Sequence, residues 1–378
     1  MKLFKSLLVA PATLGLLAPM SVTANELNIT DVSGYSSSEE IQNIKEFSPE
    51  LAITNSRVDG LEARFNDFEA AGFSETTTAS FGSNFYVGAV DEAGGLNETT
   101  TFSYDFSMDL NTSFTGEDSF DVAIIGGNVT SGNTVTSIDA VMVGDGTGDV
   151  LTLDGISYTF PVGDLTVIAG DGVGVDDLNS GACTYSALTD IASDCGTSSV
   201  GGTADSAVAA SYDFGNGFTA AGGIGFGTAT VGMLSKEDQS TVGLELAYAA
   251  DTYALSLAYT DNDEGPAQAN GDTSFYSIQG AYTPESAPYS ISAGYEFDDD
   301  DADSLFLGLT TEAGPGSLSI AATTQAIADD HDDNYAYEVS YAYDVNDGMT
   351  ITPGIFIIEQ ADPDDSAFGV VVKTSFSF

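Results

Sequence analysis

The stretch "AFGVVVKTSFSF", residues 367–378, alternates apolar residues with small or polar ones. On one face of an extended chain the apolar set consists of Phe368, Val370, Val372, Phe376 and Phe378. The opposite face carries Gly369, Lys373, Ser375 and Ser377. A period of two is typical of a β-strand whose faces meet different surroundings. Alone, this stretch fits a strand of a soluble sheet as well as a strand of a membrane barrel.

The same period recurs from residue 76 onward, with single carboxylates on the polar face. It occurs in "TFSYDFSMDL", in the predicted hairpin "VGLELAYAADTYALSLAYTD", in "YSISAGYEF" and in "YAYEVSYAYDV". Tyrosine and phenylalanine gather near the strand ends, and strands of about ten residues match the thickness of a membrane. We therefore expect the apolar face to meet lipid and the polar face to line an interior. The residues predicted to line that interior are Asp105, Asp109, Glu245, Glu296, Glu338 and Lys373.

The connections between the strands alternate between compact and long. The compact ones include "DVNDG", "EAGPG", "PESAP", "AADT", "FGNG" and "PVGD". Between them lie longer acidic segments such as "EQADPDDS", "AIADDHDDN" and "DNDEGPAQANGD". Outer-membrane barrels have short turns on one side and longer loops on the other, whereas a sandwich has no reason to alternate. Because an open sheet edge cannot face lipid, we predict an all-β fold, a closed antiparallel transmembrane barrel.

The strand number has to be even if both ends of the barrel chain lie on the same side. A direct count of alternating stretches gives about seventeen, so one assignment is wrong, and we expect the error in residues 114–150. Roughly 19 residues per strand and loop predict about 16 strands. A barrel of that width encloses water instead of a packed core, which makes the protein a channel candidate.

Composition narrows the choice of partners. The chain has 58 Asp and Glu against 7 Lys and Arg, a formal net charge of -51, so nucleic acid and anionic lipid are poor partners. Hydrophobic residues make up 42% of the chain, with 17 Tyr and 22 Phe, and this argues against disorder.

The amino terminus has the features of a secretory signal peptide. Lys2 and Lys5 precede the apolar run of residues 7–17, and small residues allow cleavage after Ala24. No later stretch is long and apolar enough for a transmembrane helix, so we expect export to the outer membrane. The expected segments are a signal peptide at residues 1–24, a periplasmic segment at 25–75 and an outer-membrane barrel at 76–378.

Residues 39–71 differ from the strands and predict a short amphipathic helix. The apolar positions follow the spacing of a coiled-coil seam, and they are Leu51, Val58, Leu61, Phe65 and Phe68. Two to three heptads are marginal alone, so partner helices are expected. A solitary amphipathic helix on a domain surface is the alternative.

Cys183 and Cys195 lie close together in the unusually long connection 171–205. In an exported protein two such cysteines are expected to form a disulfide, because no further metal ligands stand at a suitable spacing. We expect this loop to pack over or into the lumen.

Enzymatic activity is not expected, and no cofactor is implied. His331 stands in the acidic run "DDHDD", with no Ser or Cys at a plausible nucleophile elbow. Solvated acidic loops are the commoner explanation for such clusters, but loose, non-stoichiometric binding of Ca²⁺ or Mg²⁺ is expected from the charge density. The carboxylates concerned are Asp298, Asp299, Asp300, Asp301, Asp329 and Asp330.

Four segments resemble the cyanobacterial outer-membrane porins of the carbohydrate-selective porin superfamily: "MKLFKSLLVAPATLGLLAP", "SRVDGLEARFNDFEAAGFSETTT", "LDGISYTFPVGDLTVIAGDG" and "SYDFGNGFTA". The resemblance implies a trimer that lets small hydrophilic solutes and ions, including carbohydrates, diffuse passively. The family usually carries an S-layer-homology module ahead of the helix, where this chain has "ELNITDVSGYSSSEE". We therefore do not expect anchoring to peptidoglycan.

Two functional hypotheses follow. The first is a porin with a cation preference, since carboxylates around a pore favour cations. Its partners would be outer-membrane lipid and the barrel-assembly machinery, which reads a closing strand with the aromatic residues Phe376 and Phe378. The alternative is a secreted, acidic, Ca²⁺-binding surface protein of the adhesin type. It shares the acidity and the signal peptide but leaves the alternating connections unexplained.

The seam from Leu51 to Phe68 can be tested by deleting residues 39–71. Native mass spectrometry of detergent-extracted protein should show three chains for the intact sequence and a weakened trimer for the deletion, because the seam needs partner helices. The barrel of the deletion variant should still fold. A monomeric intact protein would contradict this prediction.

Overall fold

The computed structural model describes residues 77–92, 100–129, 146–202, 205–227, 239–263, 272–299, 302–325, 334–359 and 366–378. The predicted signal peptide and the predicted helix, with Leu51, Val58, Leu61, Phe65 and Phe68, lie outside these residues. Within the described ranges, no helix has the length and apolarity needed to cross a membrane.

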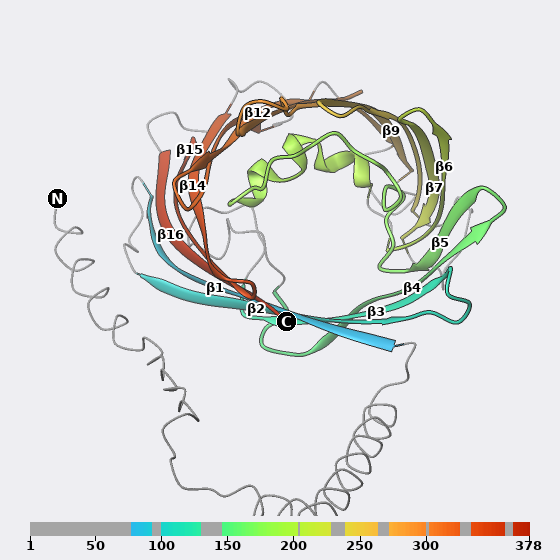
Figure 1. Ribbon diagram of the computed structural model, residues 1–378, viewed down its shortest axis with the longest axis horizontal. Coiled ribbons are helices and arrows are strands. Elements are labelled where there is room, and N and C mark those ends of the chain that lie inside the picture. The colour runs from blue at the N-terminus through green and yellow to red at the C-terminus, as the bar shows by residue number, and fades with distance from the viewer. Residues whose placement is uncertain are drawn as a thin grey trace, which may run out of the picture. The chain divides into compact units, whose positions relative to one another are not determined.

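Sixteen strands in the described residues form one closed antiparallel barrel in which each strand pairs with its neighbours in sequence (Figure 1). The strands are β1 (Thr77–Glu92), β2 (Thr101–Thr112), β3 (Ser119–Gly127), β4 (Thr152–Val162), β5 (Leu165–Asp171), β6 (Ser206–Gly215), β7 (Phe218–Phe226), β8 (Ser240–Ala249), β9 (Tyr253–Asp263), β10 (Thr273–Tyr282), β11 (Tyr289–Asp298), β12 (Asp303–Ala313), β13 (Gly316–Gln325), β14 (Asn334–Asn346), β15 (Met349–Glu359) and β16 (Ser366–Ser377). The even number confirms the sequence argument. We expected the direct count to be wrong in residues 114–150. Among the described residues of that range the structure has one strand, β3.

The barrel is closed by β1 and β16. Their register runs from Gly82 opposite Ser377 to Glu92 opposite Ala367. Beyond the register, Phe81 and Phe378 exchange two main-chain hydrogen bonds of 2.8 and 3.1 Å, and their rings stack with centroids 5.5 Å apart. The alternating stretch that opened the sequence argument is therefore the strand that removes the free edge of the sheet.

The two ends of the barrel differ in their connections. One end has tight turns, such as the turn between β6 and β7, where Asn216 and Gly217 have φ of 55° and 84°. Left-handed φ at two central residues is the geometry of the primed hairpin turns, and Asn-Gly suits it. The other end has the longer connections, the longest of those described lying between Asp171 and Ser206. This alternation was predicted from the sequence.

The outer face of the barrel is apolar. Exposed leucines include Leu244, Leu257 and Leu307, each with more than half of its surface accessible. Aromatic pairs lie toward both margins: Phe218 and Tyr248 near the tight turns, with ring centroids 4.6 Å apart, and Tyr276 and Phe297 near the long loops, 5.1 Å apart. An apolar band between two aromatic girdles is suited to lipid and not to water.

The connection between β5 and β6 folds into the barrel (Figure 1). We call residues 172–202 the inward loop; it contains two short 3₁₀ helices, η5 (Asp190–Gly196) and η6 (Ser198–Gly201). Its outgoing arm crosses the wall from β8 to β14, and its returning arm passes β12 and β11 on the way back to β6. The Cys183–Cys195 disulfide joins the two arms, with the Cα atoms 5.9 Å apart.

Glycines on the inner wall let the inward loop lie directly against the main chain of the strands. A Cβ atom added at Gly294 of β11 would lie 2.0 Å from the carbonyl oxygen of Cys195. One added at Gly354 of β15 would lie 2.1 Å from Leu188 Cδ2. At Gly294 the neighbour is main chain, so there is no room for a side chain, and at Gly354 a side chain would push Leu188 away from the wall.

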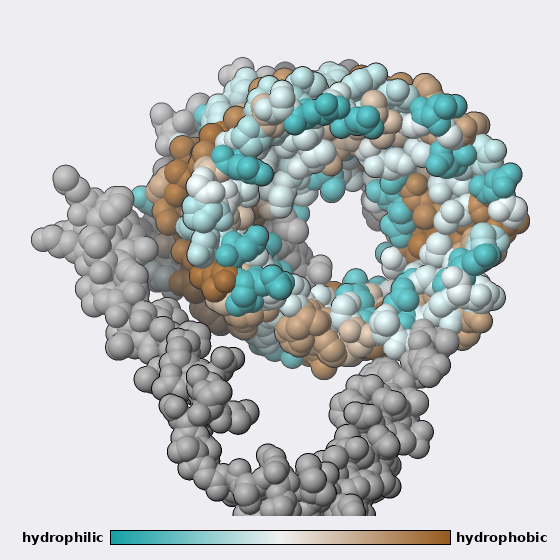
Figure 2. All heavy atoms as spheres, in the orientation of Figure 1, coloured by the Kyte–Doolittle hydropathy of each residue, from teal (hydrophilic) through white to brown (hydrophobic). Residues whose placement is uncertain are grey.

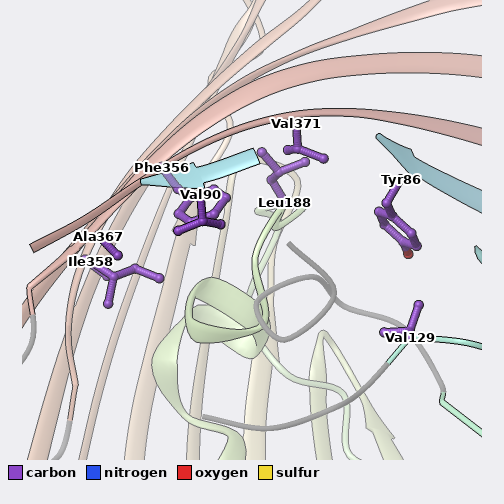
Figure 3. Close-up of a cluster of buried hydrophobic side chains, with 9 residues drawn as sticks. Tyr86, Val90, Val129, Leu188, Phe356, Ile358, Ala367 and Val371 are labelled. Atoms are coloured by element: carbon purple, nitrogen blue, oxygen red, sulfur yellow. The ribbon is translucent and has the colours of Figure 1, made fainter. Parts of the chain in front are cut away.

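The far end of the inward loop reaches an apolar cluster on the inner wall (Figure 3). Leu188 comes from the loop, whereas its partners come from β1, β14, β15, β16 and the segment after β3. The members of the cluster are Tyr86, Val90, Val129, Leu188, Ala336, Phe356, Ile358, Ala367 and Val371. Removing this apolar surface from water stabilises the loop inside the barrel.

The lipid-facing band can be tested with Leu307→Arg near the middle of β12. The free energy of unfolding in lipid vesicles should fall by about 2–4 kcal/mol, the cost of a cationic side chain at the bilayer midplane. Urea titration, followed by tyrosine fluorescence or circular dichroism, measures this free energy. Val345→Arg at the end of β14 is the matched control, with an expected loss of about 1 kcal/mol or less. Equal, small losses at both positions would place the outer face in water.

The close approach at Gly294 can be tested with Gly294→Ala. The added methyl group must push Cys195 away from the wall, so a water-soluble phosphine should reduce the disulfide several-fold faster. Release of the two thiols is measured colorimetrically. Gly280→Ala on the outer face of β10 is the control, because its nearest neighbour is the movable tip of Leu255 at 3.3 Å. Unchanged reduction in the Gly294 variant would show that the loop does not rest on β11.

Candidate functional site

The lumen of the barrel is the candidate site. An opening passes through the centre, and hydrophilic residues surround it (Figure 2). The inward loop lies along one side of the wall (Figure 1). What the passage admits depends on how the loop is held and on which charges remain in contact with water.

Glu338 of β14 holds the far end of the inward loop. Its Oε1 atom accepts hydrogen bonds from the Tyr185 hydroxyl at 2.8 Å and the Leu188 main-chain N–H at 2.9 Å. Its Oε2 atom accepts from the Thr189 N–H at 2.9 Å and the Thr189 hydroxyl at 2.6 Å. The residue is 2% exposed. Glu338 points into the barrel, as the alternation predicted, but the loop covers its carboxylate.

Glu245 and Glu296 are covered in the same way. The Glu245 carboxylate of β8 accepts the main-chain N–H groups of Ser180 at 2.6 Å and Gly181 at 2.9 Å. The Glu296 carboxylate of β11 accepts the N–H of Val200 at 3.2 Å. Three predicted lining residues, one on every third strand, therefore serve as acceptors for the loop main chain and are buried beneath it.

Uncharged wall residues complete this contact, and the sequence analysis missed them. The Gln279 side chain accepts from the Ala182 N–H at 2.8 Å and donates to the Thr197 hydroxyl at 2.6 Å. Ser292 accepts from the Thr184 N–H at 3.0 Å. Nothing in the sequence separates these residues from other polar residues on inward faces, because their role depends on where the loop passes.

Aromatic residues on the inner wall were also missed, although the sequence contains a signal for them. Phe306 is fully buried and packs edge-on against Tyr185 of the loop, with ring centroids 5.2 Å apart. Phe356 is 1% exposed in the cluster around Leu188. Both stand in runs, "LFLGL" and "IFII", that are apolar on both faces. Such runs indicate strands covered on both sides.

Asp105 of β2 and Lys373 of β16 both contact Tyr86 of β1 on another part of the wall. The Asp105 carboxylate accepts the Tyr86 hydroxyl at 2.7 Å and the Asn84 side-chain amide at 2.8 Å. The Lys373 ammonium lies 5.7 Å from the centroid of the Tyr86 ring. Lys373 is the one Lys or Arg within the described ranges, so the positive charge on the described inner wall is held beside a carboxylate and an aromatic face.

Asp109 has a different environment. It follows Asp105 by two residues on β2, shares its inward face and is exposed. Of the carboxylates predicted to line the interior, this one remains open to water in the lumen.

The inward loop brings further acidic residues into the barrel. Burial raises the pKa of Asp176, and burial together with the Asp176 charge raises the pKa of Asp177. Asp176, Asp194 and Glu245 line a cavity of about 270 Å³ between the loop and β8–β10. Within the described residues, no group of three or more His, Cys, Asp or Glu has an arrangement that could hold a metal ion.

The residues considered for divalent binding are only partly described. Asp298 accepts the Ala302 N–H at 2.8 Å, and Asp299 accepts the Ser274 N–H at 2.8 Å. Asp300, Asp301, Asp329 and Asp330 lie outside the described residues, as does His331. The predicted assembly residues Phe376 and Phe378 are on the outer face of the closing strand, where Phe376 packs edge-on against Phe85.

Known proteins resemble this chain in sequence and in fold. The chain is 24% identical to an uncharacterized protein of Nostoc sp. over 94% of its own length and 75% of that protein. Its fold is similar to two solved variants of the Rhodopseudomonas blastica porin, each carrying three substitutions. Each covers 80% of this chain and the whole of the solved chain, with 14% identity and a TM-score of 0.51.

The family model for Gram-negative porins matches residues 57–355, which is most of the chain. The matched range covers the first fourteen strands, most of β15 and the inward loop. A closed barrel with an apolar outer face and an open interior is the structure that such a channel requires. The chain therefore belongs to the Gram-negative porin family, and it is an outer-membrane channel for passive diffusion.

Proposed function

We propose that this porin prefers cations and passes small hydrophilic solutes and ions. The observation that carries the proposal is the charge around the lumen: Asp109 is exposed there, and Lys373 is held against Tyr86 beside Asp105. Carboxylates in contact with a water-filled passage favour cations. The net charge of -51 adds a negative field at the mouths that reaches about 8 Å at physiological salt.

The predicted lining residues contribute to this preference in different ways. Asp109 would meet permeating ions directly, whereas Glu245, Glu296 and Glu338 lie under the loop and would act only through their field. The three buried carboxylates already accept hydrogen bonds from the loop, and permeating ions do not contact them. The selectivity of the pore is therefore expected to depend mainly on exposed carboxylates.

Small carbohydrates would pass as other hydrophilic solutes do. The resemblance to carbohydrate-selective porins supports them as cargo. Loosely bound Ca²⁺ or Mg²⁺ at the acidic loops would need no dedicated site.

The organisation of the chain is proposed as follows. Residues 1–24 are a signal peptide, residues 25–75 a periplasmic segment with a helix that joins three chains, and residues 76–378 the barrel. The seam of the helix supports the trimer, and the aromatic residues Phe376 and Phe378 support recognition by the barrel-assembly machinery. A secreted adhesin is disfavoured, because an adhesin needs neither an open lumen nor an apolar outer face.

The cation preference can be tested with Asp109→Asn. In planar bilayers with a KCl gradient at low salt, the wild type should show a reversal potential of the sign expected for potassium, and the variant should move toward zero, because a carboxylate exposed to the passage is lost. Asp109→Glu keeps the charge and should keep the wild-type value. A wild-type channel that prefers chloride would refute the proposal.

A further inference from the structure

We propose that Glu338 is a positioning residue: it anchors the tip of the inward loop and thereby sets the open cross-section of the pore. The carboxylate would not select ions itself. This role needs only the channel function of the family and does not depend on the proposed cation preference.

The carboxylate of Glu338 is fully occupied. An ionised carboxylate has about four acceptor positions, and here four donors fill them: the Tyr185 hydroxyl, the Leu188 N–H, and the N–H and hydroxyl of Thr189. At 2% exposure, water and permeating ions do not reach it. A carboxylate without free acceptor positions or contact with water cannot coordinate a passing cation.

Ionisation suits this arrangement and protonation does not. Each carboxylate oxygen faces a main-chain N–H that can only donate, so an added proton or amide hydrogen on either oxygen would face a donor. Burial, together with the Glu338 carboxylate, raises the pKa of the Tyr185 hydroxyl, which therefore keeps its proton and donates it. Hydrogen bonds to a charged acceptor are stronger than those between neutral groups.

The anchor stands where the loop has its longest reach. The loop leaves from β5 and returns to β6, and β14 is the most distant strand to which it is hydrogen-bonded. Beside the anchor, Leu188 packs against Gly354 and into the apolar cluster of the inner wall (Figure 3). Glu245 and Glu296 hold the loop nearer to its attachments, on β8 and β11.

The disulfide closes residues 183–195, the tip of the inward loop, into a ring. Cys183 and Cys195 enclose the residues that bind Glu338, and Cys195 is fully buried against the wall beside Phe306 and Ala321. If the anchor is lost, the tip can leave the wall as a closed loop and enter the free passage. The same movement would expose the disulfide to water, which gives a readout of loop position that is independent of ion flow.

The test is Glu338→Gln, studied in planar bilayers and in detergent. The amide has the size of the carboxylate but brings a donor to a set of donors, so the tip should detach. Single-channel conductance and the size limit for uncharged polyethylene glycols should change, whereas the reversal potential should stay near the wild-type value. A water-soluble phosphine should reduce the disulfide roughly tenfold faster or more, since losing charged hydrogen bonds favours the open loop.

Two variants control for charge and for size. Glu312→Gln removes the same charge from an exposed position on the inner face of β12, where no hydrogen bond to the inward loop is present, and should not alter the reduction rate. Glu338→Asp keeps the charge but places the acceptor one methylene farther from its donors. It should retain part of the wild-type protection of the disulfide against reduction. Heat-modifiable migration on a gel verifies that each barrel is folded.

A shifted reversal potential with unchanged conductance and unchanged reduction would overturn the proposal, because Glu338 would then act as a selecting charge. If Glu338→Gln does not fold, the double variant Tyr185→Phe with Thr189→Val removes two donors and leaves the carboxylate in place. It should show a smaller increase in the reduction rate. No increase in that variant would equally overturn the proposal.

Discussion

The structure depends on one constraint: a strand that crosses lipid must have all its main-chain N–H and C=O groups paired within the protein. The pairing of β1 with β16 meets that requirement by removing the last free edge. Closure then dictates the two faces of every strand, apolar toward lipid and small or polar toward the interior. With sixteen strands the interior is too wide for side chains to fill, and a water-filled passage results.

The same rule about main-chain groups explains the inner wall. The inward loop has little regular structure, so its N–H groups need partners inside the barrel. Glu245, Glu296 and Glu338 supply carboxylate oxygens for them, and Gln279 supplies an amide oxygen. Wall glycines allow the loop to approach closely enough for these bonds. Acidic residues that look like pore lining in the sequence are, in the fold, ligands of a polypeptide.

The surplus of negative charge is consequently divided between two roles. Some carboxylates are buried and saturated with hydrogen bonds, and these stabilise the position of the loop. Others, such as Asp109, remain in water and contribute to the field that ions meet. The described inner wall balances little of this charge with basic side chains, because Lys373 lies beside Asp105 and the Tyr86 ring. Counting acidic residues alone does not distinguish the two roles.

The sequence by itself determined the strands, their facing, the alternation of turns and loops, the even strand number and the cysteine pair, because each follows from local period, spacing or closure. Only the tertiary structure decided which inward residues are covered. Glu338 and its donors Leu188 and Thr189 are about 150 positions apart in the chain, and no local pattern connects them. The runs around Phe306 and Phe356 indicate that something covers those strands, but the covering segment is identified only by the path of the loop. That path follows from long-range packing and hydrogen bonding, which the facing of individual strands does not encode.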